Sequence, residues 1–144
     1  MEKFKVGIIG ATGMVGQRFI TLMDGHPWFE PVALAASSRS AGKPYADADA
    51  EKLASQVDFV FCAVDMKKDA IQALEYRYAR LECPVVSNNS AHRGTPDVPM
   101  VIPEINNDHL EIIASQKKRL GTSRGFIAVK SNCSLQSYVP ALSI

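Results

Sequence analysis

The sequence predicts an α/β protein with a doubly wound, mostly parallel sheet of the Rossmann type and helices on both faces. Short, almost continuously apolar runs alternate with segments whose apolar residues recur at helical spacing. Each strand with the helical segment that follows it spans about 30 residues, the size of a crossover unit that connects two parallel strands. The first apolar run also ends in a glycine-spaced turn, Gly10 to Gly16, which leads directly into a helical segment. Near-continuous apolar strands are typical of a sheet that is covered on both faces.

Five strands are expected, because each is a short apolar run bounded by glycine, proline or polar residues. Their ranges are Val6–Ile9, Val32–Ala36, Asp58–Val64, Pro84–Ser87 and Phe126–Val129.

Helices are expected where apolar residues recur every three or four positions. Their ranges are Met14–Asp24, Asp47–Gln56, Met66–Arg80 and Asn107–Arg119, with a final helix that follows Cys133. Gly25 and Pro27 fit the end of the first helix, and basic residues occupy the last turn of the segment 107–119. The segments 37–45 and 88–99 are expected to be loops.

Composition narrows the class of protein. The chain has 144 residues, of which 47% are hydrophobic and 22% charged, as in an ordinary globular domain. A net charge of +1 gives no basis for nucleic-acid binding. No apolar run reaches the roughly 18 residues of a membrane span. Three cysteines without framework spacing, and no leader pattern, favour a reducing cytoplasm. No histidine and cysteine spacing resembles a metal site.

The turn that follows the first strand has the spacing of a dinucleotide-binding loop. Gly10 would permit the tight turn, Gly13 the close approach of a pyrophosphate, and Gly16 the packing of helix on strand. The helix N-terminus would then face the phosphates. The alternative is a tight turn without a ligand.

The end of the second strand indicates which dinucleotide binds. An NAD enzyme usually carries an acidic residue there for the ribose hydroxyls. Here the chain continues as Ser37-Ser38-Arg39-Ser40 without an acid. Ser38 and Arg39 suit a 2′-phosphate, so NADP is predicted as the cofactor. The alternative is a solvated loop in which Arg39 has no ligand.

Cys133 is the candidate nucleophile. It follows an apolar strand and begins a helix, where orphan N–H groups and the helix dipole favour a thiolate. The alternative is a small residue that packs at a strand–helix junction. Its general acid or base would be His92, His26 or a residue beyond Ile144.

The loop Ser87 to Arg93 combines amides, hydroxyls and an arginine at the sheet edge where ligands bind in such folds. Spacing alone leaves two interpretations open: an oxyanion site, or a turn that its own side chains hold together. Structural roles are predicted for Cys62 and Cys83, and surface positions for His26 and His109.

Several motifs, in this order, resemble those of the aspartate-semialdehyde dehydrogenase family, and more closely its archaeal and fungal branch. They are Gly10-Ala11-Thr12-Gly13-Met14-Val15-Gly16, Ser37-Ser38-Arg39-Ser40-Ala41-Gly42, Asn89-Ser90-Ala91-His92-Arg93, Ile102-Pro103-Glu104 and Ser131-Asn132-Cys133-Ser134. The resemblance extends over the whole chain.

The resemblance implies a chemistry. The family converts L-aspartyl-4-phosphate to L-aspartate 4-semialdehyde with NADPH, for the synthesis of lysine, threonine and methionine. It implies that Cys133 is the nucleophile that forms a thioester, and that Asn132 and Arg93 hold the phosphate. The glycine turn, with Thr12, Met14 and Val15, would hold the pyrophosphate, and Ser38 with Arg39 the 2′-phosphate.

The resemblance also implies a domain organisation. Residues 1–144 would form one NADP-binding domain that ends just after the cysteine segment 131–136. The family's C-terminal catalytic and dimerisation domain, with its histidine acid or base, would be absent from this chain. The stretch 43–57 looks shorter than in the family. The full-length enzyme would be a homo-oligomer that binds an acyl phosphate. Two alternatives are a malonyl-coenzyme A reductase and a nucleotide-binding module without catalysis.

Overall fold

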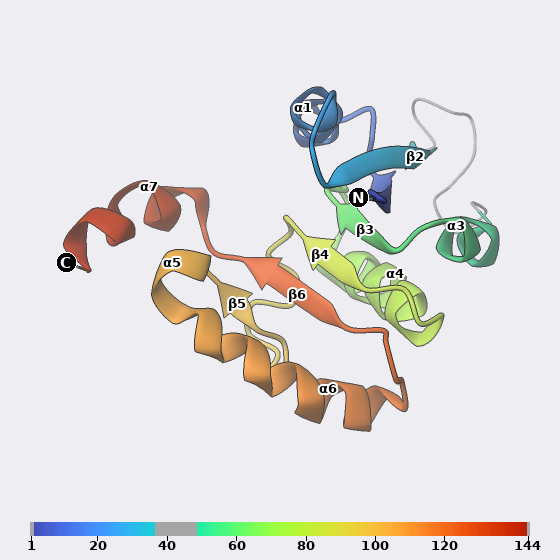
Figure 1. Ribbon diagram of the computed structural model, residues 1–144. Coiled ribbons are helices and arrows are strands. Elements are labelled where there is room, and N and C mark those ends of the chain that lie inside the picture. Colours follow the sequence, from blue (N-terminus) through green and yellow to red (C-terminus); the bar gives the residue numbers. More distant parts are fainter. Residues whose placement is uncertain (1, 37–48, 144) are drawn as a thin grey trace.

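The computed structural model describes residues 2–36 and 49–143 (Figure 1). Its sheet has six strands in the order β2-β1-β3-β4-β6-β5, and every neighbouring pair is parallel. The chain runs from β1 outward to β2 and then returns to place β3 on the other side of β1. That reversal is the switch point beside which doubly wound sheets bind ligands. The predicted fold class is therefore confirmed.

The strands are β1 (Phe4–Ile9), β2 (Phe29–Ala35), β3 (Phe59–Cys62), β4 (Val85–Ser87), β5 (Met100–Val101) and β6 (Ile127–Lys130). The helices are α1 (Met14–Met23), α3 (Ala50–Gln56), α4 (Lys68–Arg80), α5 (Pro103–Asn106), the 3₁₀ helix η1 (Asn107–Ile112), α6 (Ile113–Leu120) and α7 (Cys133–Leu142).

The prediction of five strands was wrong by one. The sixth strand, β5, has two residues at the edge of the sheet, and so short a segment carries no periodicity. The helix predicted over 107–119 begins as the 3₁₀ turn η1 and becomes α-helical only at Ile113. Strand β2 begins three residues earlier than expected, because Pro31 lies in an edge strand where the register with β1 shifts.

Alternation along the central strands divides the core between two faces. Val6 and Ile8 of β1 pack with Phe61 of β3 on the face that α1 covers. Ile9 and Val60 point to the opposite face and join the larger cluster beneath α3 and α4. Successive strand residues alternate between faces, so short apolar strands supply both layers. Helices on both faces of the sheet are thus confirmed.

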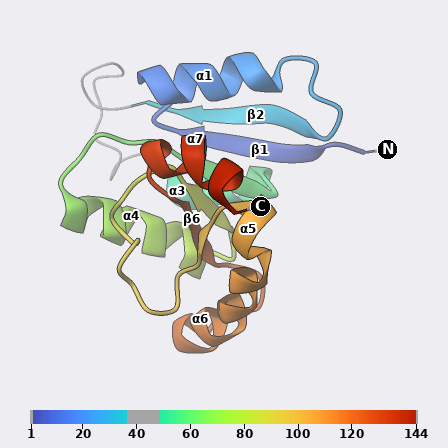
Figure 2. The same cartoon turned by 90° about the vertical axis from the view of Figure 1, so that its left-hand side faces the viewer.

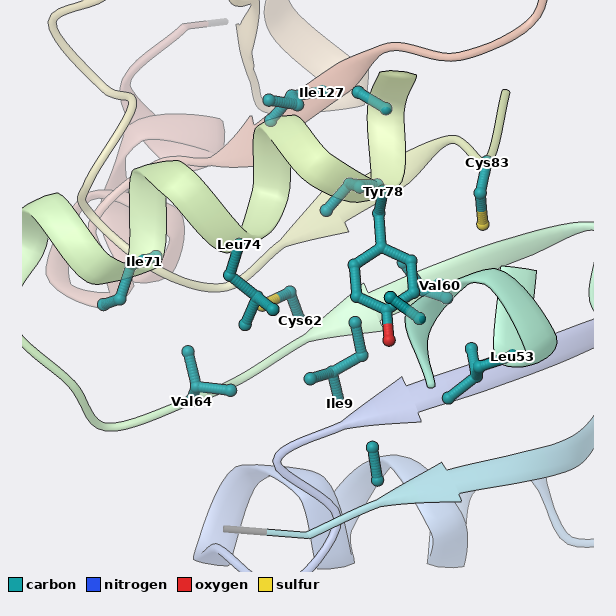
Figure 3. Packing of buried hydrophobic residues seen from close by; sticks show 14 of the residues in the cluster. Ile9, Leu53, Val60, Cys62, Val64, Ile71, Leu74, Tyr78, Cys83 and Ile127 are labelled. Carbon is teal, nitrogen blue, oxygen red and sulfur yellow. The ribbon is translucent and has the colours of Figure 1, made fainter. Parts of the chain in front are cut away.

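Figure 3 shows how α4 contributes to the larger cluster: Ile71, Leu74 and Tyr78 project from one stripe of the helix toward β1 and β3. Burial raises the pKa of the Tyr78 hydroxyl to about 12. The thiols of Cys62 and Cys83 are buried in the same cluster, and burial raises the pKa of each. Both cysteines are structural, as predicted.

The carboxyl ends of the central strands lie at one edge of the sheet. Ile9 pairs with Cys62, Cys62 with Ser87, and Ser87 with Val129. The segments that follow β1, β3, β4 and β6 therefore leave the sheet side by side. In Figure 1, β6 points toward α7, and Figure 2 views the molecule from that side. Among the described residues, no helix has the length and apolar character that a membrane span requires.

Candidate active site

The turn after β1 depends on two glycines that could not carry a side chain. Gly10 has φ +92°, and a Cβ there would lie 2.3 Å from the carbonyl oxygen of Ala63. A Cβ on Gly16 would lie 2.1 Å from the oxygen of Gly10. Gly10 therefore lets the turn approach the end of β3, and Gly16 lets α1 pack on the turn. The role of Gly10 in the tight turn is the one that the spacing predicts, whereas the close contact of Gly16 is with the turn at Gly10 and Ala11 and not with the strand.

Gly13 differs from both, because its Cβ position is almost open. The nearest atom, the Gly10 oxygen, is 3.4 Å away, at the near limit of ordinary contact. Gly13 is exposed and precedes α1 with φ −74° and ψ 162°, and no side chain among the described residues caps the helix. The orphan N–H groups of the first turn therefore have no side-chain partner among these residues. This arrangement is what an incoming phosphate requires.

Exposed side chains border the same helix start. Met14 is 90% exposed, and Val15 and Thr12 are also exposed. The turn is tied to the end of β2, since the N–H groups of Gly10 and Ala11 both donate to the Ala35 oxygen. The chain beyond Ala36, which contains Ser38 and Arg39, lies outside the described residues. The assignment of these two residues to a 2′-phosphate stays a prediction.

Cys133 is exposed and is the first residue of α7, directly after the segment that leaves β6. Asn132 is the N-cap: its Oδ1 accepts the Ser134 N–H at 2.9 Å and lies 3.7 Å from the Cys133 Sγ. The predicted position at a helix start is confirmed. Its role as a nucleophile is not tested by this geometry.

Arg93 connects the loop after β4 to the segment before Cys133 through hydrogen bonds. Its Nε donates to the Lys130 oxygen at 3.2 Å, and its Nη2 to the Ser131 oxygen at 3.4 Å. These contacts use two of the five N–H donors of the guanidinium. The Arg93 guanidinium thus contacts the backbone at the end of β6, from which the chain continues into α7. Arg93 is therefore bound to the backbone that leads into Asn132 and Cys133. The roles of these three residues in phosphate binding and catalysis stay predictions.

Buried polar side chains lie beneath the loop that carries Arg93. Glu75 of α4 accepts the Ser87 hydroxyl at 2.5 Å and the Asn89 side-chain amide at 3.0 Å, both at Oε1. The Asn89 N–H donates to the Ser87 Oγ at 3.0 Å. His92 is fully buried, and its Nε2 lies 3.8 Å from the Glu75 Oε2. The loop is therefore held by its own side chains together with Glu75 of α4. An oxyanion site at Arg93 stays a prediction.

Glu75 was not singled out from the sequence. It lies four residues after Ile71 and three before Tyr78, so it occupies the apolar stripe of α4. An acidic residue at such a position was the available signal. Burial raises the pKa of the Glu75 carboxyl, and burial lowers the pKa of His92.

The remaining histidines have separate local roles. His109 is exposed, as predicted. His26 is half-buried: its Nδ1 accepts the N–H groups of Trp28 and Phe29, each at 3.2 Å, and its ring stacks on Phe29. The prediction of a plain surface residue missed this turn-holding contact. The lone pair of the His26 Nδ1 is engaged in these contacts. His26 precedes β2 and lies at the amino end of this strand, whereas the candidate site lies at the carboxyl ends of the strands.

Comparison with known proteins gives a consistent result. Residues 5–113 match the family model "Semialdehyde dehydrogenase, NAD binding domain". The aspartate-semialdehyde dehydrogenase of Schizosaccharomyces pombe is 40% identical over 96% of this chain and 44% of its own length. That of Methanothermobacter thermautotrophicus is 44% identical over 90% of this chain and 42% of its own length.

Solved structures agree. The aspartate-semialdehyde dehydrogenase of Candida albicans with NADP superposes with a TM-score of 0.80 at 36% identity, and the match covers 97% of this chain and 46% of that one. A Vibrio cholerae aspartate-semialdehyde dehydrogenase II complexed with ASA gives 0.74 at 26% identity, over 99% of this chain and 46% of that one. The chain thus spans less than half the length of these relatives.

Proposed function

The chain belongs to the semialdehyde dehydrogenase family and contains its NAD-binding domain, and from this premise we propose that it forms the cofactor-binding part of an NADPH-dependent aspartate-semialdehyde dehydrogenase. The reaction is the reductive dephosphorylation of L-aspartyl-4-phosphate to L-aspartate 4-semialdehyde. The observation that carries the proposal is the meeting of the Arg93 guanidinium with the backbone that leads into Cys133.

The glycine turn fits a dinucleotide. The helix start at Gly13 is uncapped by side chains of the described residues, and a Cβ at this position would occupy the approach of a phosphate. Thr12, Met14 and Val15 border that approach, so we assign them with Gly10, Gly13 and Gly16 to the cofactor.

Cys133 attacks the acyl carbon in the proposed reaction. The new bond joins Sγ to this carbon, and the bond from the carbon to the phosphate oxygen breaks. Arg93 and Asn132 hold the phosphate as it leaves, because a guanidinium and an amide N–H donate to its oxygens. NADPH, when bound, supplies the hydride that reduces the thioester to the aldehyde. The carbon–sulfur bond breaks as the aldehyde forms, and the released thiolate is available for another turnover.

The chain spans less than half the length of the relatives that it matches. We propose that a general acid or base and a partner for the substrate carboxylate come from outside these 144 residues. His92 is not assigned this role, because it is fully buried beneath the loop. We further propose that the complete enzyme is a homo-oligomer of the cytoplasm.

The proposal is tested by reverse turnover in the natural protein that contains this chain. We expect reduction of NADP with aspartate semialdehyde only when inorganic phosphate is present, and none with malonate semialdehyde. Preference for malonate semialdehyde and coenzyme A would instead identify a malonyl-coenzyme A reductase. NADPH binding without turnover of either aldehyde would identify a non-catalytic module.

The choice of NADP has its own test. Replacement of Arg39 by alanine removes the cation proposed for the 2′-phosphate. We therefore expect Arg39→Ala to weaken NADPH binding by on the order of tenfold and to leave NADH binding unchanged. Equal losses for both dinucleotides would contradict the assignment of Ser38 and Arg39.

A further inference from the structure

The buried polar cluster beneath the loop 88–93 contains two atoms without a hydrogen-bond partner. They are the Glu75 Oε2 and the His92 Nε2, and they face each other at 3.8 Å. Both side chains are fully buried. An unpaired polar atom in such a place costs free energy, so two of them at one point call for a joint explanation.

The neighbouring contacts restrict where protons lie. The Glu75 Oε1 already accepts from the Ser87 hydroxyl and the Asn89 amide, which leaves Oε2 to face His92. On the far side of the imidazole, Nδ1 lies 3.0 Å from the Thr95 Oγ1. A proton on either Oε2 or Nε2 makes these two atoms donor and acceptor, whereas a proton on both or on neither does not.

Charge selects among the remaining states. The groups that face the pair are Cys62 and Asn89 at the carboxylate, and Tyr76, whose ring meets the edge of His92 at 4.6 Å. The charged groups that act on His92 are Arg119, Asp97 and Lys68, and Arg119 is itself paired with Asp97. Neither Arg119 nor Lys68 forms an ion pair with the buried Glu75 carboxylate. A pair with no net charge avoids the cost of an unbalanced buried charge, and it requires a proton on Nδ1 that is donated to Thr95.

We propose that Glu75 and His92 form a net-neutral pair that holds one proton between Oε2 and Nε2, and that this pair positions Arg93 for the leaving phosphate. The first part stands on the buried geometry alone, and the second rests on the proposed function. Glu75 and His92 are positioning residues, because they act through the loop.

The connection to Arg93 is short. His92 precedes Arg93 in the chain, and Ser87 and Asn89, which are bound to the same carboxylate, lie at the start of the loop. The Arg93 N–H donates to the Ser90 oxygen, and α4 also holds the loop through Gln72, which donates to the Ala91 oxygen at 2.8 Å. Loss of the Glu75 carboxylate therefore releases both ends of the loop at once.

Steady-state kinetics of the natural protein tests the positioning role. We expect Glu75→Leu to raise the KM for phosphate in reverse turnover by on the order of tenfold and to leave the KM for NADP unchanged. Glu75→Gln should restore the KM for phosphate, because its carboxamide accepts at Oε1 and donates toward His92. A Glu75→Gln variant as impaired as Glu75→Leu would overturn the proposal.

Gln116 provides a matched control. It is fully buried and binds the Asp97 oxygen and both backbone polar groups of Ile127, at the end of β6 opposite to Lys130, which Arg93 contacts. Gln116→Leu should lower stability as Glu75→Leu does, without raising the KM for phosphate. Equal effects of the two variants on this KM would show that Glu75 has a merely structural role.

A spectroscopic measurement covers the case in which Glu75→Leu does not fold. Nitrogen-15 NMR of the histidine-labelled natural protein should find Nδ1 of His92 protonated, both in the wild type and in Glu75→Gln. An unprotonated Nδ1 in the wild type would overturn the net-neutral pair. If wild-type turnover does not depend on phosphate, the proposed function fails, while the NMR result still decides the pair.

Discussion

Two segments at the carboxyl edge of the sheet are built in opposite ways. The turn after β1 is made by the absence of side chains, since Gly10 and Gly16 each lie where a Cβ would meet a backbone oxygen. The loop after β4 is made by buried side chains, with Glu75 at their centre. The first segment is a pattern of consecutive residues between β1 and α1. The second depends on Glu75 of α4, which lies twelve residues before Ser87 in the chain.

The difference teaches how each segment tolerates change. A glycine turn of this kind is destabilised when an added side chain overlaps with the backbone. Its binding surface consists of the backbone N–H groups that no side chain covers. A side-chain network fails through an unpaired buried group, and an isosteric replacement preserves it. Substitutions in the two segments should therefore separate stability from ligand binding in different ways.

The largest effect is expected in the turn. Gly16→Ala places a Cβ 2.1 Å from the Gly10 oxygen, so we expect it to lower the free energy of unfolding by about 3 kcal/mol. Gly13→Ala meets no such contact and should cost less than about 1 kcal/mol, while it weakens NADPH binding by on the order of tenfold.

Urea denaturation and fluorescence titration of NADPH measure the two quantities. If Gly13→Ala destabilises the protein as much as Gly16→Ala, the separation of structural and binding glycines is wrong.

The next effect concerns the loop. Arg93→Leu removes the guanidinium beside the cysteine segment, so we expect the KM for phosphate in reverse turnover to rise by on the order of a hundredfold. The KM for NADP should not change. Arg124 offers a matched control, because it is an exposed arginine that contacts Asp58 before β3. A similar increase in Arg124→Leu would contradict the local role of Arg93.

How far the sequence predicts these two segments follows from how they are built. The glycine turn and the position of Cys133 were predicted because both are patterns of consecutive residues between a strand and a helix. Glu75 was missed because its partners, Ser87, Asn89 and His92, lie beyond the reach of any local spacing. The two-residue strand β5 was missed because it depends on its pairing with β6.

The smallest effect is expected outside both segments. The Glu82 carboxylate accepts the N–H groups of Ser123, Arg124 and Gly125, and these hydrogen bonds lower its pKa to about 2. Its folded pKa lies below the value of about 4.3 in an unfolded chain. The stabilisation is therefore fully present above about pH 4.3 and is lost as the pH falls toward 2.

Glu82→Gln should remove this part of the pH dependence. Glu82 is only half-buried and lies before β4, away from the carboxyl edge of the sheet. The KM values of the Glu82→Gln variant for phosphate and NADP should therefore equal those of the wild type. Thermal unfolding between pH 2 and pH 5 measures the change. An unchanged acid slope would contradict the role of the Glu82 hydrogen bonds.

The central claim is that the glycine turn holds the cofactor for a reaction that Cys133 carries out. Cys133→Ser keeps a small polar residue at the start of α7 and removes the thiol. The measurement is turnover and NADPH affinity of this variant in the natural protein. The account predicts that reductase turnover is lost while NADPH binds as in the wild type. Retained turnover would contradict it.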